Sequence, residues 1–320
     1  MNVAIENDAA KQINAATAAT HSHVCTLFEG GYHAGLAAFT NSLVASGFSG
    51  IIWVGYRGAL PPWARGNRHV VAENVALEFI PLSTDIHLTN YKPQFMLDLI
   101  RSGKVDSGYL WYFDPDIVVT APWLFFKQWS QFGIALIEDI NNSRANDHPI
   151  RMMWRKCGSA LECTETKSLD KYYNAGFIGV PTSAIEVLEL WNRLIRFAAQ
   201  SGASLKVFLP GGPTNPFYAP DQDAMNAMLM YANVPQSTMG PEAMGFFPGG
   251  YVMAHAIGRP KPWEGIRIVR ALQGYAPSYA EKMFYRFCDG PIPVFSNPQK
   301  WMRRVDLLAA SAIGRVYRRR

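Results

Sequence analysis

Short apolar runs of strand length alternate with longer amphipathic segments along the first third of the chain, and this alternation limits the fold more than any other feature. Strands that are separated by helices pair in parallel, with helices on both faces of the sheet. The pattern therefore predicts an α/β domain with a mostly parallel central sheet, whose ligands bind beyond the carboxyl ends of the strands. The strand candidates are His23–Phe28, Ile51–Val54, Ala76–Ile80 and Tyr109–Phe113, and the helix candidates are Tyr32–Ser46 and Tyr91–Ile100.

The pattern is less regular further along the chain. The segment Asp139–Asp170 is polar and arginine-rich with little periodicity, which predicts a long loop. Tyr173–Val180 predicts a strand and Ile185–Ala198 a helix. Glycine and proline make Pro210–Pro220 a turn segment, and a helix is expected from about Gln222 to Tyr231.

Composition excludes several classes of protein. Hydrophobic residues make up 49% of the chain and charged residues 17%, which is typical of a folded domain. The formal net charge of +5 is too small to indicate a nucleic-acid partner. None of the 4 cysteines forms a Cys-x-x-Cys pair, so we expect reduced thiols in a cytoplasmic protein. We see neither a secretory signal nor an apolar run near the roughly 20 residues of a membrane span.

Two carboxylates follow the strand candidate that ends at Phe113. Proline cannot donate to a sheet ladder, so Pro115 is expected to end the strand and to leave Asp114 and Asp116 at the carboxyl edge of the sheet. Side chains two residues apart in an extended segment point the same way. Their oxygens suit Mn²⁺ or Mg²⁺, an ion that stabilises a departing diphosphate. An isolated Asp-x-Asp pair is also common in turns, where it satisfies backbone N–H groups.

Three later segments carry further polar groups in a pattern of their own. An Asn-Ala-Gly turn precedes an apolar strand at Asn174, and carboxylates and amides begin a helix at Asp221. Their ordinary roles are turn formation and helix capping, but such groups can also bind sugar hydroxyls. The third segment offers an imidazole for a metal, a glycine that lets backbone approach a ligand, and a lysine for phosphate. The three segments are Asn174-Ala175-Gly176, Asp221-Gln222-Asp223-Ala224-Met225-Asn226 and His255-Ala256-Ile257-Gly258-Arg259-Pro260-Lys261-Pro262-Trp263.

Taken in order, the Asp-x-Asp pair and these three segments resemble glycosyltransferase family 8. This is the family of glycogenin and the bacterial lipopolysaccharide galactosyl- and glucosyltransferases. The resemblance spans roughly residues 23 to 263 and implies a GT-A-type nucleotide-diphospho-sugar transferase fold. It also implies Mn²⁺ (with Mg²⁺ as the second choice) and transfer of a hexose from UDP-galactose or UDP-glucose with retention. The expected acceptor is a glycan or a lipid-linked saccharide, as in lipopolysaccharide biosynthesis.

The resemblance also implies a role for individual residues. Asp114, Asp116 and His255 would bind the metal, and Gly258 and Lys261 the diphosphate. The nucleobase would lie near Glu29 and Tyr32, and Lys92 is the candidate for a basic substrate-binding residue on the helix before the Asp-x-Asp strand. Asn174 would line the sugar pocket together with the two catalytic candidates, Asp221 and Gln222. Residues that bind the acceptor are expected in Asn141–Lys167.

Two other functions fit parts of the pattern. Asp-x-Asp after an apolar strand is also similar to the nucleophile loop of haloacid-dehalogenase-type phosphohydrolases. In that reading, Asp114 attacks phosphorus and Asp116 is the general acid, but no convincing acidic pair for magnesium follows. The other alternative is a non-catalytic protein that binds sugar nucleotides on the same scaffold.

The C-terminal segment combines helical periodicity with positive charge. Apolar residues recur at helical spacing from Trp301 to Val316, and arginines follow as far as Arg320. Such a helix either packs its apolar stripe on the domain or lies on an anionic membrane, which would place the protein at the inner membrane face. We therefore expect a flexible segment over residues 1–20, a catalytic domain over 21–290 and a basic amphipathic helix over 291–320.

Overall fold

The computed structural model describes residues 21–208 and 215–317. The predicted flexible segment 1–20, most of the first half of the predicted turn segment and the last three arginines lie outside the described residues. Within the described ranges, nine strands form one sheet in the order β10-β7-β9-β5-β1-β2-β4-β3, with β8 paired to β7. These strands are β1 (Ser22–Glu29), β2 (Gly50–Arg57), β3 (Arg68–Ala72), β4 (Val75–Pro81), β5 (Tyr109–Phe113), β7 (Ile134–Ser143), β8 (Lys171–Tyr173), β9 (Phe177–Pro181) and β10 (Gln236–Met239).

The centre of the sheet is parallel, as the sequence predicts. Strand β1 pairs in parallel with β2 and β5, β2 pairs in parallel with β4, and β10 pairs in parallel with β7. Antiparallel pairs involve β3, β8 and β9. The predicted α/β class with a mostly parallel sheet is therefore confirmed.

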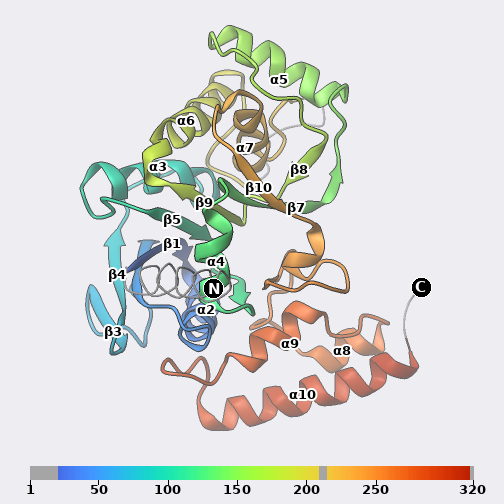
Figure 1. Ribbon diagram of the computed structural model, residues 1–320. Coiled ribbons are helices and arrows are strands. Elements are labelled where there is room, and N and C mark those ends of the chain that lie inside the picture. The colour runs from blue at the N-terminus through green and yellow to red at the C-terminus, as the bar shows by residue number, and fades with distance from the viewer. Residues whose placement is uncertain (1–20, 209–214, 318–320) are drawn as a thin grey trace, which may run out of the picture.

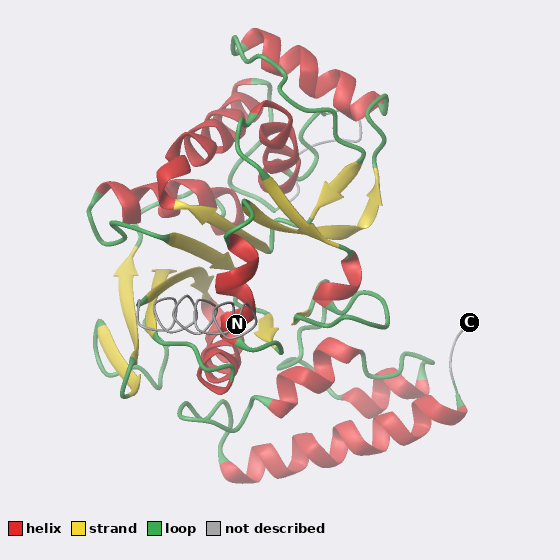
Figure 2. Cartoon of the chain, viewed as in Figure 1, coloured by secondary structure: helices red, strands yellow, loops and turns green. Residues whose placement is uncertain are grey.

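Helices cover both faces of the sheet (Figures 1 and 2). Strand β1 shows why, because its residues alternate between two cores: Cys25 and Leu27 belong to one, and Val24 and Phe28 to the other. The first core contains α3 (Leu88–Arg101), α6 (Ile185–Gln200) and α7 (Pro220–Tyr231). The second contains α2 (His33–Ala45) and α4 (Trp123–Ser130). Three 3-10 turns occupy Gly30–Tyr32, Thr182–Ala184 and Pro241–Met244.

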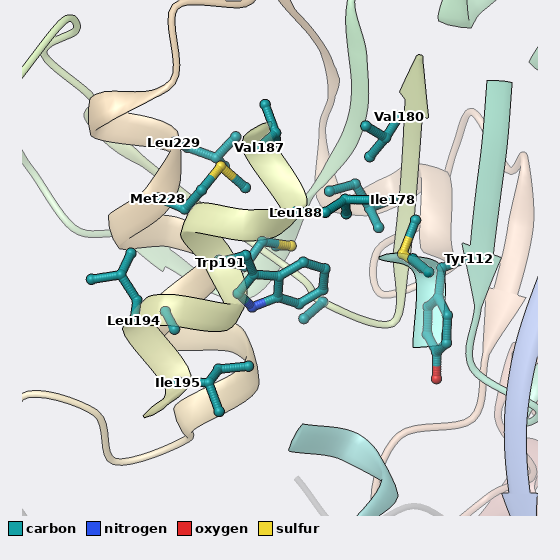
Figure 3. Close-up of a cluster of buried hydrophobic side chains, with 14 of the residues drawn as sticks. Tyr112, Ile178, Val180, Val187, Leu188, Trp191, Leu194, Ile195, Met228 and Leu229 are labelled. Carbon is teal, nitrogen blue, oxygen red and sulfur yellow. The ribbon is translucent and has the colours of Figure 1, made fainter. Parts of the chain in front are cut away.

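Trp191 of α6 lies at the middle of the first core (Figure 3). Its side chain is 0% exposed and packs with apolar residues of α6, α7 and β9. Its indole Nε1 donates a hydrogen bond to the main-chain oxygen of Asp221 at 2.8 Å. Packing in the core therefore also fixes the first turn of α7.

Replacing Trp191 with Ala is expected to lower the free energy of unfolding by about 3–5 kcal/mol, because a large buried side chain leaves a cavity. Trp301 is the matched control, since its side chain is 68% exposed. Trp301→Ala is expected to change the same quantity by less than about 0.5 kcal/mol. Urea unfolding followed by far-ultraviolet circular dichroism measures both, and equal costs for the two variants would contradict the packing described.

The predicted loop over Asp139–Asp170 is wrong. Strand β7 continues to Ser143, and α5 (Pro149–Ala160) follows it. The sequence pattern does not predict α5, because the buried face of this helix includes a charged residue. Arg151 is fully buried and donates hydrogen bonds to the main-chain oxygens of Arg144 and Lys171.

The predicted strand Tyr173–Val180 is two strands. Strand β8 ends at Tyr173, and β9 begins at Phe177. Between them, the side-chain oxygen of Asn174 accepts a hydrogen bond from the Gly176 N–H at 2.8 Å. This turn is the reason for the break, because an asparagine side chain that bonds two residues ahead replaces the sheet ladder.

Three helices follow the sheet region and lie together at the lower right of Figure 1. They are α8 (Arg267–Leu272), α9 (Tyr279–Arg286) and α10 (Asn297–Val316). The carboxylate of Asp306 on α10 accepts hydrogen bonds from the N–H groups of Arg267 and Ile268 at 2.7 and 2.9 Å, so α10 caps the start of α8. The predicted helix beyond Trp301 is present and begins four residues earlier, at Asn297.

The apolar stripe of α10 faces outward. Trp301, Val305, Leu308 and Val316 are all exposed, and Ala312 between them is exposed too. The buried positions are on the opposite side of the helix, at Ala310 and Gly314. The stripe therefore does not pack on the domain, which was one of the two arrangements that the sequence allowed.

Candidate metal centre

Two short strands outside the main sheet bring distant residues together. Strand β6 (Ile117–Val119) pairs antiparallel with β11 (Met253–His255), and this register places His255 opposite Ile117. The main-chain oxygen of Asp116 accepts a hydrogen bond from the Ala256 N–H at 3.1 Å. The pairing thus fixes His255 beside the carboxylates that follow β5, although more than a hundred residues separate them in the sequence.

Asp114, Asp116 and His255 form a compact set of potential metal ligands. One ligand atom from each lies within 4.8 Å of the other two. The Nε2 atom of His255 is 3.4 Å from Oδ1 of Asp116 and 3.9 Å from Oδ2 of Asp114. Two carboxylates and an imidazole fit Mn²⁺, which accepts both oxygen and nitrogen ligands. The three residues that the sequence proposes as ligands are therefore together in the structure.

Lys92 of α3 lies beneath this centre. Its side chain is 2% exposed, and its Nζ atom is 3.0 Å from Oδ1 of Asp114 and 3.1 Å from Oδ2 of Asp221. It also donates to the main-chain oxygen of Ala175 at 3.0 Å. Burial alone would lower the pKa of Lys92, but the two aspartates more than offset it and the pKa is raised. Lys92 is therefore a charged link between β5, the Asn174 turn and α7, and its expected contact with substrate stays a prediction.

Lys261 holds the second carboxylate. Its Nζ atom is 2.5 Å from Oδ2 of Asp116 and donates to the main-chain oxygen of Ala256 at 2.8 Å. Burial alone would raise the pKa of Asp116, but His255 and Lys261 together hold the pKa of this carboxyl far below its usual range. Asp116 is thus ionised at neutral pH.

Carboxylates outnumber ammonium groups in this cluster. Asp114, Asp116 and Asp221 share two ammonium groups, those of Lys92 and Lys261. Burial raises the pKa of Asp221 to about 6, although Lys92 opposes the shift. Carboxylate oxygens gathered in this way beside an imidazole suit a divalent cation.

Asn174 and Gly176 shape the wall next to His255. The side-chain nitrogen of Asn174 donates to Oδ2 of Asp139 at 2.6 Å. A Cβ on Gly176 would lie 2.5 Å from Cε1 of His255, so only glycine lets the turn approach the imidazole. The predicted sugar-binding residue Asn174 therefore also orders the turn that borders the metal ligands.

The two catalytic candidates begin α7. The carboxylate of Asp221 is buried and paired with Lys92. The Oε1 atom of Gln222 accepts a hydrogen bond from the Ala175 N–H at 3.0 Å. Both residues are therefore fixed against the Asn174 turn.

The residues proposed for the nucleobase and diphosphate lie at the ends of β1 and β11. Glu29 ends β1 and pairs with Arg57 at the end of β2, with 2.7 Å between Oε2 and Nη2. The Tyr32 ring packs edge-on against Trp263 at 5.3 Å and lies 5.7 Å from the Lys261 ammonium. Gly258 has φ +75°, a conformation that favours glycine, and no heavy atom lies within 4 Å of the position of a Cβ.

Two residues near the centre were not expected from the sequence. Tyr112 donates its hydroxyl hydrogen bond to Oδ1 of Asp114 at 2.8 Å, and Asp139 is the buried partner of Asn174. Asp139 could have been identified from the sequence, since it comes soon after the apolar run Ile134–Ile137, much as Asp114 follows β5. Tyr112 could not have been identified in this way, because a tyrosine in an apolar strand is usually just a residue of the core.

No protein-family model and no curated protein matches the chain. Solved structures do resemble it. The apo structure of WbbM, a bifunctional glycosyltransferase, has a TM-score of 0.53 at 16% identity, covering 91% of this chain and 52% of WbbM. The glycosyltransferase GlyE of Streptococcus pneumoniae TIGR4 has a TM-score of 0.50 at 12% identity, covering 92% of this chain and 64% of GlyE.

The fold is of the GT-A type. This confirms the fold that the four sequence segments imply. The chain spans about half the length of WbbM and less than two thirds of GlyE, and identities this low concern the fold alone.

Replacing Lys92 with Met tests the charged link beneath the centre. The change leaves the buried carboxylate of Asp221 and the partly buried carboxylate of Asp114 without their cation, and it is expected to cost about 3–5 kcal/mol in the free energy of unfolding. Adding Asp221→Asn to Lys92→Met is expected to recover part of that loss, because one of the uncompensated charges is gone. Urea unfolding measures both variants, and a stable Lys92→Met single variant would contradict the link.

Proposed function

We propose that this chain is a metal-dependent glycosyltransferase that takes a hexose from a nucleotide-diphosphate sugar. One observation carries the proposal: the ligand atoms of Asp114, Asp116 and His255 lie within 4.8 Å of one another. They do so beyond the carboxyl end of β5, where ligands bind on such sheets. The fold that holds them is the one seen in WbbM and GlyE, both glycosyltransferases.

Asp114, Asp116 and His255 would hold Mn²⁺, with Mg²⁺ as the second choice. A divalent ion at this place supplies charge stabilisation to the diphosphate as it leaves. The ammonium of Lys261 neutralises Asp116 without a metal. Lys261, in the same loop as the open backbone at Gly258, would supply an ammonium to the diphosphate.

The other donor contacts follow from the positions of the side chains. We propose that the nucleobase of a UDP-sugar binds near Tyr32 and Glu29. The Tyr32 ring lies close to the Lys261 ammonium, and Glu29 is at the end of β1. Asn174, Asp221 and Gln222 are proposed to line the sugar pocket, as the family resemblance implies for UDP-galactose or UDP-glucose. Lys92 is proposed to act by positioning Asp114 and Asp221, because its buried ammonium already contacts both.

Retention at the anomeric carbon is part of the proposal. It requires either a nucleophile beneath the sugar or attack by the acceptor on the same face that the phosphate leaves. Asp221 is buried and paired with Lys92, which makes its carboxylate a poor nucleophile. This arrangement favours same-face attack, with Asp221 and Gln222 orienting the sugar.

The phosphohydrolase alternative has less support. It needs Asp114 free to attack phosphorus, but Asp114 accepts hydrogen bonds from Lys92 and Tyr112. The likeness to glycosyltransferase structures also argues against it. The third alternative, binding of sugar nucleotides without turnover, differs from the main proposal only in turnover.

Asp116→Asn is expected to weaken Mn²⁺ binding by more than about 100-fold, since loss of a direct ligand costs more than loss of an outer partner. Asp106→Asn is the matched control, because this carboxylate is exposed and outside the cluster. Electron paramagnetic resonance of free Mn²⁺ gives both affinities, and calorimetry gives the Mn²⁺-dependent affinity for UDP. Unchanged Mn²⁺ and UDP binding in Asp116→Asn would reject the metal centre.

The acceptor is proposed to be a glycan or a lipid-linked saccharide, as in lipopolysaccharide biosynthesis.

The C-terminal extension over 291–320 is proposed to contact the membrane surface. No helix in the described part of the chain is long and apolar enough to cross a bilayer. The exposed stripe of α10 supports peripheral contact instead, with Leu308 70% exposed. Arg315 lies on α10, and each cation near an anionic surface contributes about 1 kcal/mol. Such contact would place a catalytic domain over 21–290 in the cytoplasm, at the inner membrane face.

Vesicles test the membrane contact. The protein is expected to float with vesicles that contain anionic phosphatidylglycerol at low salt, and not with neutral vesicles. The double variant Trp301→Glu/Leu308→Glu is expected to stay behind, because it puts charge on the stripe. Phe132→Glu is the matched control, since Phe132 is an exposed apolar residue far from α10 in the sequence. If the unaltered protein stays in solution with anionic vesicles, the proposed contact between the α10 stripe and the membrane is wrong.

A further inference from the structure

A cavity of about 700 Å³ lies beside the metal centre. It is lined by residues of the loop from Gly245 to Tyr251, by the start of α9 and the segment before it, and by His255, Ala256 and Ile257. Its volume is within the roughly 300–1,000 Å³ of pockets that hold small-molecule ligands. Asp114, Asp221 and Gln222 do not line it, so it adjoins the centre without including the proposed sugar pocket of the donor.

Three tyrosines are part of the lining of this cavity. The rings of Tyr251 and Tyr279 are stacked, with centroids 3.9 Å apart and planes 18° apart. Tyr251 is 38% exposed and Tyr275, also in the lining, is 47% exposed. Exposed aromatic rings in a concave site offer flat apolar faces to a ligand.

The backbone is built to accept this stack. Gly245 has φ +75°, and a Cβ there would lie 2.6 Å from Cδ1 of Tyr279. Only glycine allows both the turn and the close approach of the ring. The stacked pair of Tyr251 and Tyr279 is therefore a fixed part of the contact between the Gly245–Tyr251 loop and α9.

Charged groups surround the rings. Arg270 and Glu281 are paired at 3.3 Å, and Glu281 is also held by Arg267 at 2.9 Å. Lys282 and Arg259 complete the charged part of the lining. Apolar ring faces next to hydrogen-bonding groups match a saccharide, whose rings have an apolar face and an edge of hydroxyl groups.

We propose that this cavity is a subsite for the saccharide acceptor. It would hold a sugar beyond the one that receives the transferred hexose, because His255 lines it while Asp114, Asp221 and Gln222 do not. This inference rests on the proposed function. It adds the Gly245–Tyr251 loop and α9 to the acceptor site, which the sequence places in Asn141–Lys167, and Ile140 at the border of that segment lines the same cavity.

An array of immobilised oligosaccharides tests the subsite directly. The full chain, with Mn²⁺ and UDP present, is expected to bind a defined group of glycans on the array. Tyr251→Ala and Tyr279→Ala are each expected to weaken that binding about tenfold, because an aromatic contact is lost. Tyr251→Phe is expected to bind as the unaltered protein does, since the ring is kept. Tyr218→Ala is the matched control, because Tyr218 is also an exposed tyrosine, at 45% against 38% for Tyr251, but is not in the lining of the cavity.

Calorimetry with UDP and Mn²⁺ on the same proteins separates this proposal from the function on which it rests. Loss of glycan binding in Tyr251→Ala, with UDP binding unchanged, supports the subsite. If the unaltered protein binds no glycan, or if Tyr251→Ala, Tyr279→Ala and Tyr218→Ala all bind alike, the subsite is rejected. Where Tyr279→Ala fails to fold, Tyr251→Ala and Tyr251→Phe decide. If UDP binding is absent from the unaltered protein, the proposed function fails, whatever the array shows.

Discussion

The buried ammonium of Lys92 is the contact on which the centre depends. It joins Asp114 after β5, Ala175 in the turn between β8 and β9, and Asp221 at the start of α7. These segments are far apart in the sequence. The turn before β9 lies beside the carboxyl end of β5 because the two strands are antiparallel, and the Asp114 N–H donates a hydrogen bond to the main-chain oxygen of Gly176 at 2.7 Å. A buried ammonium such as that of Lys92 is stable only when it is paired. The same pairing that stabilises the fold therefore sets the direction in which the aspartates point.

The candidate metal centre also depends on a second pair of strands, because only two of its three potential ligands, Asp114 and Asp116, follow a strand of the main sheet. Strand β6 continues the chain directly after Asp116 and pairs with β11, which carries His255. Lys261 then closes the cluster by pairing with Asp116. A site built in this way holds its carboxylates in place before a cation arrives. In the proposed function, that preorganisation lets a divalent ion and Lys261 act together on a diphosphate.

Much of this arrangement could be predicted from the sequence, for physical reasons. The apolar runs of β1 and β5 are plain because central parallel strands are buried on both faces. Asp114 and Asp116 are indicated by two carboxylates directly after an apolar strand, whereas His255 is indicated as a ligand only by the resemblance of the ordered segments to a known family. Helix α5 was missed because Arg151 is buried by hydrogen bonds to main-chain oxygens, and such a residue looks exposed in a sequence. The partners of Lys92 and the outward stripe of α10 depend on tertiary contacts that no local pattern encodes.

Turnover is the most direct measurement of the central claim. The full chain would be incubated with a panel of nucleotide-diphosphate sugars, without acceptor, and release of the nucleoside diphosphate followed with Mn²⁺ and with a chelator. The account predicts slow release from UDP-galactose or UDP-glucose that requires Mn²⁺ and is lost in Asp114→Asn. Binding of UDP without release from any sugar nucleotide would indicate a binding protein. Release that is unchanged by the chelator, or by Asp114→Asn, would contradict metal-dependent glycosyl transfer at this centre.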